Sequence, residues 1–230
     1  MKLSEKYRVV KGLPLYQQVY ENMKARIIQG EFGSGSKIIE SKISEDPGVS
    51  RSPIREAIRM LLTDGLLVEN DGSTIVNPMS YKDTVEVYEC RIVMESFAAR
   101  RAAENITNSA LEKLEELVAA TTELRKTQLP ENYPKIIELN TVFHELIVLA
   151  SGHDRMIDYI TKNNALSMLS RANEFYLFNR PNNYRNEHLG ILDALKARNG
   201  DLAEDRMRVH TQNDLEFYKE QYAKAREDQE

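Results

Sequence analysis

Four histidines are the side chains of this 230-residue sequence that could most directly bind a metal ion: His144, His153, His188 and His210. His153 lies in an SGHD turn, whereas the other three fall within helical hydrophobic patterns on three different predicted helices. A single histidine on a helix is more often a packed or surface residue than a ligand. Spacing along the chain therefore favours a structural role for each histidine taken alone.

Asn140 and His144 have a spacing that also suits metal binding. Residues four apart project from the same face of a helix, so one ion could bridge the two side chains. His188 and His210 lie on successive predicted helices that would run antiparallel, and imidazoles from several helices can converge inside a bundle. The sequence thus contains a candidate metal site of Asn140, His144, His188 and His210.

A second set of candidate residues lies in the stretch GVSRSPIREAIRMLLTDGLL, at residues 48–67. Its apolar residues recur at intervals of three and four, which predicts a helix that buries one face. Ser50 or Ser52 can cap this helix, and Pro53 is tolerated in the first turn, where no backbone donor is needed. The helix therefore begins with small residues that leave its amino end accessible.

Arg51 and Arg55 lie one turn apart in this helix, outside the apolar stripe. Guanidinium groups at a helix start can bind guanine edges or phosphates. The alternative is that the two arginines pair with Glu56 or Glu45 on a solvated face. The neighbouring elements decide between these interpretations.

Those elements follow the order of a winged helix-turn-helix. Pro14 and a four-residue apolar repeat predict a first helix, and Ile39 and Ile43 indicate a short second helix that stops at Pro47-Gly48. After the third helix, LLVENDGSTIV predicts a hairpin that turns at Asn70-Asp71-Gly72. Because the second helix of a helix-turn-helix enters the major groove by its amino end, this order favours DNA binding by the arginines.

After Ser80 the strand signals end and long amphipathic helices are predicted. They span about residues 81–104, 108–127, 132–151, 154–179, 184–198 and 200–226. The fold class is therefore mainly α, with an N-terminal winged helix-turn-helix and a C-terminal all-α bundle of about six helices. We expect a DNA-binding domain at 1–77, a linker at 78–81 and a helical effector-binding and dimerisation domain at 82–230.

Composition is compatible with this division. The net charge is −5, but residues 1–78 carry 11 lysines and arginines against 10 aspartates and glutamates, so the negative charge lies in the C-terminal part. A weakly positive module can bind DNA if its cations gather on one surface. The single cysteine cannot form an internal disulfide, and no apolar run is long enough to cross a membrane, so we expect a cytoplasmic protein.

The stretch at 48–67 resembles the recognition helix of the GntR superfamily of bacterial transcriptional regulators, with a pattern close to GVSRTPVREAL-x-x-L-x-x-[ED]-GL. YECRIVMESFAARRAAE at 88–104 is similar to the first helix of the C-terminal FCD ligand-binding domain in the FadR branch. The resemblance continues through NTVFHELIVLASG and EHLGILDAL, and covers nearly the whole chain.

The resemblance implies DNA contacts at the start of the third helix and from the wing tip. One departure is that some members carry an arginine where Ser41 stands, so that contact is absent or is supplied by Lys42 or Lys37. The implied DNA-binding residues are Ser50, Arg51, Ser52, Pro53, Arg55, Gly72, Ser73 and Thr74.

The resemblance also implies a metal site and an effector pocket. Metal-binding FCD domains use an Asp-x-x-x-His pair and two later histidines, which match His144, His188 and His210, whereas Asn140 replaces the aspartate. An amide oxygen can still bind Zn²⁺, Ni²⁺ or Mn²⁺ but brings no negative charge, so the metal affinity should fall. The implied effector-binding residues are Arg91 and Glu95, which match the family's R-x-x-x-E pattern, although their spacing is also that of a plain i, i+4 pair. Tyr88 and Arg171 are further candidates for the pocket.

The function expected from these residues is that of a homodimeric DNA-binding transcriptional regulator, most simply a repressor of a short palindromic operator. A small organic or sugar acid would be its effector. A metal-dependent enzyme is the competing class, because three histidines with an open coordination position can activate water, but the sequence has no HExxH motif. A metal-free regulator whose histidines bind the acid directly is the third possibility.

Overall fold

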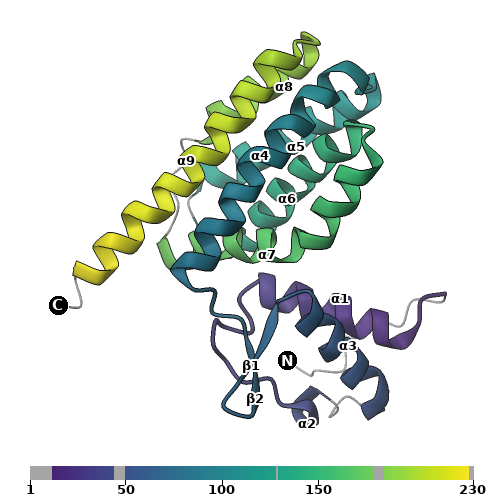
Figure 1. Cartoon of the computed structure of the whole chain (residues 1–230), viewed down its shortest axis with the longest axis vertical. Helices are drawn as coiled ribbons and strands as arrows, with labels where there is room; N and C mark the ends of the chain where they lie inside the picture. Colours follow the sequence, from purple (N-terminus) through teal and green to yellow (C-terminus); the bar gives the residue numbers. More distant parts are fainter. Residues whose placement is uncertain (1–11, 44–49, 128, 179–183, 228–230) are drawn as a thin grey trace. The chain divides into compact units, whose positions relative to one another are not determined.

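The computed structural model describes residues 12–43, 50–127, 129–178 and 184–227, and the chain divides into two compact units between Pro78 and Met79 (Figure 1). The predicted end of the second helix at Pro47-Gly48 and the predicted break at Pro181-Asn182-Asn183 lie outside the described residues.

The N-terminal unit has three helices followed by a two-stranded antiparallel sheet. Its core is the contact between the first and third helices, which bury the apolar residues that recur at three- and four-residue intervals. The expected winged helix-turn-helix is therefore confirmed. Its elements are α1 (Leu15–Ile28), α2 (Glu40–Ile43), α3 (Arg51–Thr63), β1 (Leu67–Asn70) and β2 (Ser73–Val76).

The end of α3 is held by two kinds of contact. Gly65 has a φ of +76°, and Leu66 N–H donates to the carbonyl of Leu61, which is a glycine-terminated helix end. The hydroxyl of Tyr20 on α1 donates to Asp64 Oδ2 at 2.5 Å. The carboxyl end of α3 is thus tied to α1, which fixes how α3 is presented.

The wing is a hairpin with a two-residue turn. Asn70 pairs with Ser73, so Asp71 and Gly72 form the turn, and both have positive φ values of 47° and 69°. Two left-handed residues in a two-residue turn define the type I′ hairpin that the Asn-Asp-Gly sequence predicts. On its other edge β2 is bridged by Lys37, through the pairing of Lys37 with Ile75.

The C-terminal unit is an all-α bundle of six long helices in the described residues, with a 3-10 turn at Pro130–Asn132. In Figure 1, α4 and α9 run side by side, and they form the most extensive helix contact of the unit. The six-helix expectation is confirmed. The helices are α4 (Tyr81–Asn105), α5 (Asn108–Lys126), α6 (Tyr133–Ala150), α7 (Asp154–Phe178), α8 (Tyr184–Lys196) and α9 (Gly200–Glu227).

Small residues allow α4 to pack closely inside this bundle. Two alanine pairs, Ala98-Ala99 and Ala102-Ala103, are fully buried. At the start of α9, a Cβ on Gly200 would lie 3.2 Å from the carbonyl oxygen of Arg100 on α4, so a larger residue would force the two backbones apart. The C-terminal half of α4 is therefore a packing surface, and its buried polar residues lie nearer the N-terminal end.

This part of α4 contributes to a buried polar interior, which is unusual for a helical bundle. Arginines, acids and histidines from α4, α6, α7, α8 and α9 are each less than 5% exposed there. No helix in the described part of the chain is long and apolar enough to span a membrane. Buried charge at this density marks a candidate site.

Candidate functional site

The amino end of α3 presents the residues expected to contact DNA. Ser50, Arg51, Ser52 and Arg55 are exposed and Pro53 is half-buried, whereas the opposite face of the helix is buried in the unit. Ser50 occupies the N-cap position, but its side chain makes no capping hydrogen bond. Its hydroxyl is therefore not used to cap the helix.

The two arginines of α3 have different surroundings. Arg55 Nε donates to Glu40 Oε2 at 3.0 Å, so α2 supplies its acidic partner. Arg51 makes no ion pair within the described residues, and Glu56 pairs with Arg59 rather than with either of them. Glu45, the other acid considered from the sequence, lies outside the described residues.

The wing carries the remaining predicted DNA contacts. Gly72 is exposed at the turn, and Ser73 and Thr74 are half-exposed. The Thr74 hydroxyl donates to Glu69 Oε1 at 2.9 Å across the hairpin, so it stiffens the wing. Lys37 is exposed at the edge of β2, which places one of the two proposed substitutes for the missing second-helix arginine beside the wing. Ser41 is exposed on α2, and the side chain of Lys42 is outside the described part of the structure.

In the C-terminal unit, three of the four histidines converge. His188 Nε2 lies 3.2 Å from His210 Nε2, which lies 3.3 Å from His144 Nε2. The three side chains come from α6, α8 and α9 and are each at most 3% exposed. His153 is elsewhere, where its Nδ1 accepts from the backbone of Met156 at the start of α7.

Carboxylates contact two of these imidazoles at Nδ1, the ring nitrogen that points away from the cluster. Glu95 Oε2 lies 2.6 Å from His144 Nδ1, and Glu187 Oε2 lies 2.8 Å from His210 Nδ1. An acceptor at Nδ1 favours the tautomer that carries its proton there, which leaves Nε2 as an unprotonated donor atom. Burial lowers the pKa of His144 to about 3, although Glu95 acts in the opposite direction, so this ring is neutral at neutral pH.

The donor set fits a transition metal. Two nitrogen ligands that each lie about 2.1 Å from an ion are about 3.2 Å apart when they subtend about 100°. The observed nitrogen separations agree with this geometry. Three imidazoles, two of them contacted at Nδ1 by carboxylates, are also the ligand chemistry of Zn²⁺ or Ni²⁺ sites.

Asn140 and Asp214 lie next to the histidines along their helices. Asn140, one turn before His144, is 7% exposed, and its buried Oδ1 has no hydrogen-bond partner. Asp214, one turn after His210, is 3% exposed and places Oδ2 3.7 Å from His210 Nε2. The missing aspartate on α6 is therefore accompanied by a buried carboxylate on α9, which the sequence did not reveal.

Glu95 links the histidines to two buried arginines. Its Oε1 accepts from Arg91 Nε at 2.9 Å and from Arg171 Nη2 at 3.4 Å. Burial alone would raise the pKa of Glu95, but Arg91, His144 and Arg171 together hold that pKa well below its usual range. Burial, aided by Arg91, lowers the pKa of Arg171 to about 10, so its guanidinium is still charged at neutral pH.

Tyr88 belongs to the same network but faces another partner. Its ring lies 4.8 Å from the guanidinium carbon of Arg91, and its hydroxyl donates to Glu174 on α7. Burial, and then the charge of Glu174, raise the pKa of Tyr88 well above its usual value. The Tyr88 hydroxyl is therefore protonated, and the side chain contacts both Arg91 and Glu174 of α7.

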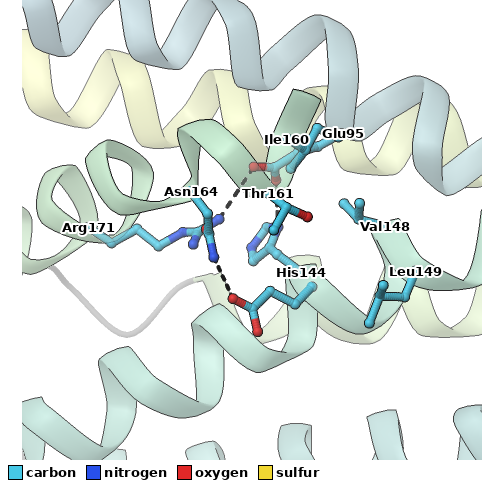
Figure 2. A pocket seen from close by; sticks show the side chains of 9 residues that line it. Glu95, His144, Val148, Leu149, Ile160, Thr161, Asn164 and Arg171 are labelled. Atoms are coloured by element: carbon cyan, nitrogen blue, oxygen red, sulfur yellow. Dashed lines mark hydrogen bonds and ion pairs between the residues drawn. The ribbon is translucent and has the colours of Figure 1, made fainter. Parts of the chain in front are cut away.

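A cavity of about 230 Å³ adjoins this network between α6 and α7 (Figure 2). Of the four predicted effector residues, Glu95 and Arg171 line it, whereas Arg91 and Tyr88 do not. His144 is a lining residue too, so the cavity borders the histidine cluster. The full lining is Glu95, His144, Glu145, Val148, Leu149, Ile160, Thr161, Asn164 and Arg171.

Several residues of this region were not identified from the sequence. Glu187 precedes His188 and Asp214 follows His210 by one turn, and this adjacency was an available signal. Glu174 and Asn164 carry no comparable local signal, because only the packing of α7 brings them to the site. Their positions required the three-dimensional structure.

A winged helix-turn-helix in the same chain as a helical domain whose buried polar cluster borders a cavity defines a class of protein, the DNA-binding regulator with a ligand-sensing domain. The sequence matches two family models accordingly. "Bacterial regulatory proteins, gntR family" covers residues 15–76, and "FCD domain" covers residues 86–213. The chain belongs to the GntR family of bacterial transcriptional regulators and carries the FCD domain at its C-terminal end.

Individual relatives agree with this assignment. The chain is 30% identical to the HTH-type transcriptional regulator YdhC of Bacillus subtilis over 93% of this chain and 95% of YdhC. It is 29% identical to the HTH-type transcriptional repressor RspR of Escherichia coli over 86% of each chain. Among solved structures, E. coli McbR/YncC superposes with a TM-score of 0.77, with 23% identity, 91% of this chain and 99% of that chain, which supports the fold.

These findings establish the general function. The protein is a DNA-binding transcriptional regulator with a ligand-sensing C-terminal domain. The metal-dependent enzyme considered from the sequence is set aside, because the family and the relatives are regulators. Effector binding to an FCD domain and DNA binding by a GntR domain are the activities that the two domains provide.

Proposed function

We propose that the protein is a repressor that binds a short palindromic operator as a homodimer and releases it when a small carboxylate occupies the C-terminal cavity. The observation that carries this proposal is Arg171, which lines the cavity at 2% exposure, with Nε and Nη1 buried and without a hydrogen-bond partner among the described residues. In this scheme residues 1–77 bind DNA, 78–81 link, and 82–230 sense the effector and dimerise. The operator lies in the cytoplasm, so the protein acts there.

Arg171 indicates the charge of the effector. A buried donor left without an acceptor costs about 1–3 kcal/mol, and a carboxylate can satisfy two guanidinium donors at once. Behind it, Arg91 Nη1 and Nη2 are also buried and without a hydrogen-bond partner. A small organic or sugar acid placed against Arg171 would therefore supply acceptors for these donors.

The histidine cluster supports a bound Zn²⁺, Ni²⁺ or Mn²⁺ ion as part of this site. His144, His188 and His210 would hold it, with Asn140 and Asp214 as candidate oxygen ligands from α6 and α9. When bound, such an ion offers an electrophilic position to a carboxylate oxygen. His144 and Arg171 line the same cavity, so a carboxylate bound there would border the metal site as well.

Glu95 is the residue through which occupancy can change the protein. Its carboxylate is shared among Arg91, Arg171 and His144. An effector carboxylate that binds Arg171 competes with Glu95 for the same guanidinium. The direct contact between Arg171 on α7 and Glu95 on α4 would then be replaced by a contact through the ligand. Such a local exchange is the kind of differential contact on which ligand-controlled equilibria depend.

DNA release by the effector is the direct test. Genomic fragments are screened by gel shift for sequence-selective, salt-sensitive binding, and the selected fragment is then titrated by fluorescence anisotropy with sugar acids and short carboxylates, with and without added divalent metal. We expect at least one acid to weaken binding in the natural sequence but not in Arg171→Met. An acid that strengthens operator binding would contradict repression, and binding with no sequence preference would contradict the whole proposal.

Elemental analysis separates the metal-containing regulator from the metal-free alternative. The purified protein should contain about one transition-metal ion per chain, and His188→Ala should lose it. His153→Ala is the matched control, because His153 lies outside the cluster, and it should retain the metal. If the natural protein and both variants contain no metal and bind none on addition, the histidines instead serve the acid directly.

A further inference from the structure

Glu145 gives the cavity a second electrostatic character. This residue follows His144 on α6, lines the cavity and is half-buried. Its carboxylate accepts a hydrogen bond from Asn164 on α7, drawn as a dashed line in Figure 2. Within the described residues it makes no ion pair, whereas the other cavity carboxylate, Glu95, contacts two arginines and a histidine. Only one of the two cavity carboxylates therefore has its charge offset.

A second group near Glu145 is also suited to accept hydrogen bonds. Asn164 uses its amide nitrogen for Glu145, which turns its oxygen into the remaining acceptor at that place. Thr161, one turn earlier on α7, adds a hydroxyl to the lining. The cavity lining therefore contains one guanidinium donor group, Arg171, and an acidic acceptor pair of Glu145 and Asn164.

Arg171 and Glu145 favour groups of opposite charge on one ligand. A carboxylate fits Arg171, but a second carboxylate near Glu145 would face a like charge, because Glu145 makes no ion pair within the described residues. A hydroxyl could donate to Glu145 but would leave its charge unbalanced, whereas an ammonium group donates and neutralises. The cavity, at about 230 Å³, has room for a short chain between two such groups.

We infer that the effector is a short amino acid that binds through its carboxylate to Arg171 and through its ammonium group to Glu145. Glu145 is then the residue that determines specificity against dicarboxylates. This inference rests on the proposed carboxylate-sensing function and narrows its ligand class.

Matched ligands test the inference with the full-length protein. For each chain length from three to six carbons, the ω-amino acid, the ω-hydroxy acid, the unsubstituted acid and the dicarboxylate are titrated by calorimetry. At the best chain length the amino acid should bind about tenfold or more tighter than the dicarboxylate, because a hydrogen bond to a charged group contributes on that scale. Equal or tighter binding of the dicarboxylate overturns the inference.

Two variants on α6 assign the effect to one residue. Glu145→Gln keeps the shape and an acceptor oxygen but removes the charge, so the preference for the amino acid should disappear while the unsubstituted acid binds within about twofold of the natural affinity. Glu138→Gln is the control, because Glu138 is on the same helix, exposed, and paired with Lys135. A preference that survives Glu145→Gln, or one lost in Glu138→Gln as well, overturns the role of Glu145.

Failure of the inference and failure of the proposed function give different results. If the unsubstituted acid binds and Arg171→Met abolishes that binding, the carboxylate site stands whatever Glu145 does. If no acid of any length binds the natural protein, both the carboxylate site and the amino-acid inference are wrong.

Discussion

Glu95 shows how much one buried side chain can depend on its neighbours. A carboxylate at 4% exposure is stable as an anion only because guanidinium groups from two helices and an imidazole surround it. The i, i+4 spacing of Arg91 and Glu95 is compatible with an ordinary surface pair, and the sequence left that alternative open. The structure shows the same pair in the interior, where it joins the histidines to the cavity.

At Asn140, restoring the carboxylate should strengthen metal binding. Asn140→Asp places a negative oxygen where a buried amide oxygen has no hydrogen-bond partner, one turn from His144. We expect the dissociation constant for Zn²⁺ to fall about 10- to 100-fold, the scale on which supporting groups tune metal affinity. Competition against a chromophoric chelator measures the change.

Two further variants complete that experiment. Asn163→Asp adds the same charge at an exposed position on α7 and should leave the dissociation constant unchanged. Asp214→Asn should weaken binding if the carboxylate on α9 supplies the charge that α6 lacks. An unaltered affinity in Asn140→Asp would place Asn140 outside the ion's coordination sphere.

At the scale of elements, α3 should read DNA by its amino end. Arg51→Ala is expected to weaken specific operator binding by about 1–3 kcal/mol and to relax the preference at one base pair if Arg51 contacts a base edge. Arg59→Ala is the matched control, because Arg59 is exposed on the same helix two turns later and already pairs with Glu56. Anisotropy titrations with operator and scrambled DNA compare the two. A uniform loss on both DNAs would instead make Arg51 a phosphate contact.

The contact between α1 and the end of α3 should support the N-terminal unit. Tyr20→Phe removes the hydroxyl that donates to Asp64 and should lower the free energy of unfolding by about 1 kcal/mol, the usual contribution of one hydrogen bond. Tyr16→Phe, on the same helix and 38% exposed, should change it little. Urea unfolding followed by circular dichroism provides both values, and equal losses would show that the hydroxyl is unimportant.

The helices were predictable because their ends carry local chemistry. Ser80 and Asp83 form a reciprocal capping box at the start of α4, and Thr107 accepts from Ala110 N–H at the start of α5. With these signals the predicted ranges agree with the six C-terminal helices to within one or two residues, as does the hairpin at Asp71-Gly72.

The composition of the site was harder to predict than the helices. The convergence of His144, His188 and His210 required the family resemblance, because spacing alone favoured a structural role for each. Glu174 and Asn164 meet the site through the packing of α7 against α4 and α6, which local sequence does not encode. Arg171 lines the cavity whereas Arg91 does not, and this difference likewise depends on how the helices are rotated and not on the spacing of the residues.

For the whole molecule, effector and operator should oppose each other by the same factor. Linkage requires that an effector which weakens operator binding by a given factor is itself bound more weakly by that factor on the operator complex. We expect a factor of about 5 to 150, the usual range of such coupling. Calorimetric titration of effector into protein with and without operator DNA checks the equality. Different factors in the two directions would mean that more than one binding equilibrium is being observed.

The three converging histidines also mean that a bound ion would act as a reversible cross-link of the folded C-terminal unit. His188 is 22 residues from His210, and His144 is 66 residues from His210, so one ion would close two long loops across three helices. All four histidines of the sequence follow residue 143, so the winged unit contributes none. An ion present at 100 times its dissociation constant adds about 2.7 kcal/mol to the folded C-terminal unit, which corresponds to a rise of about 5–10 °C in its melting temperature. The thermal stability of one half of this regulator would then report the concentration of free metal, and the other half would not respond.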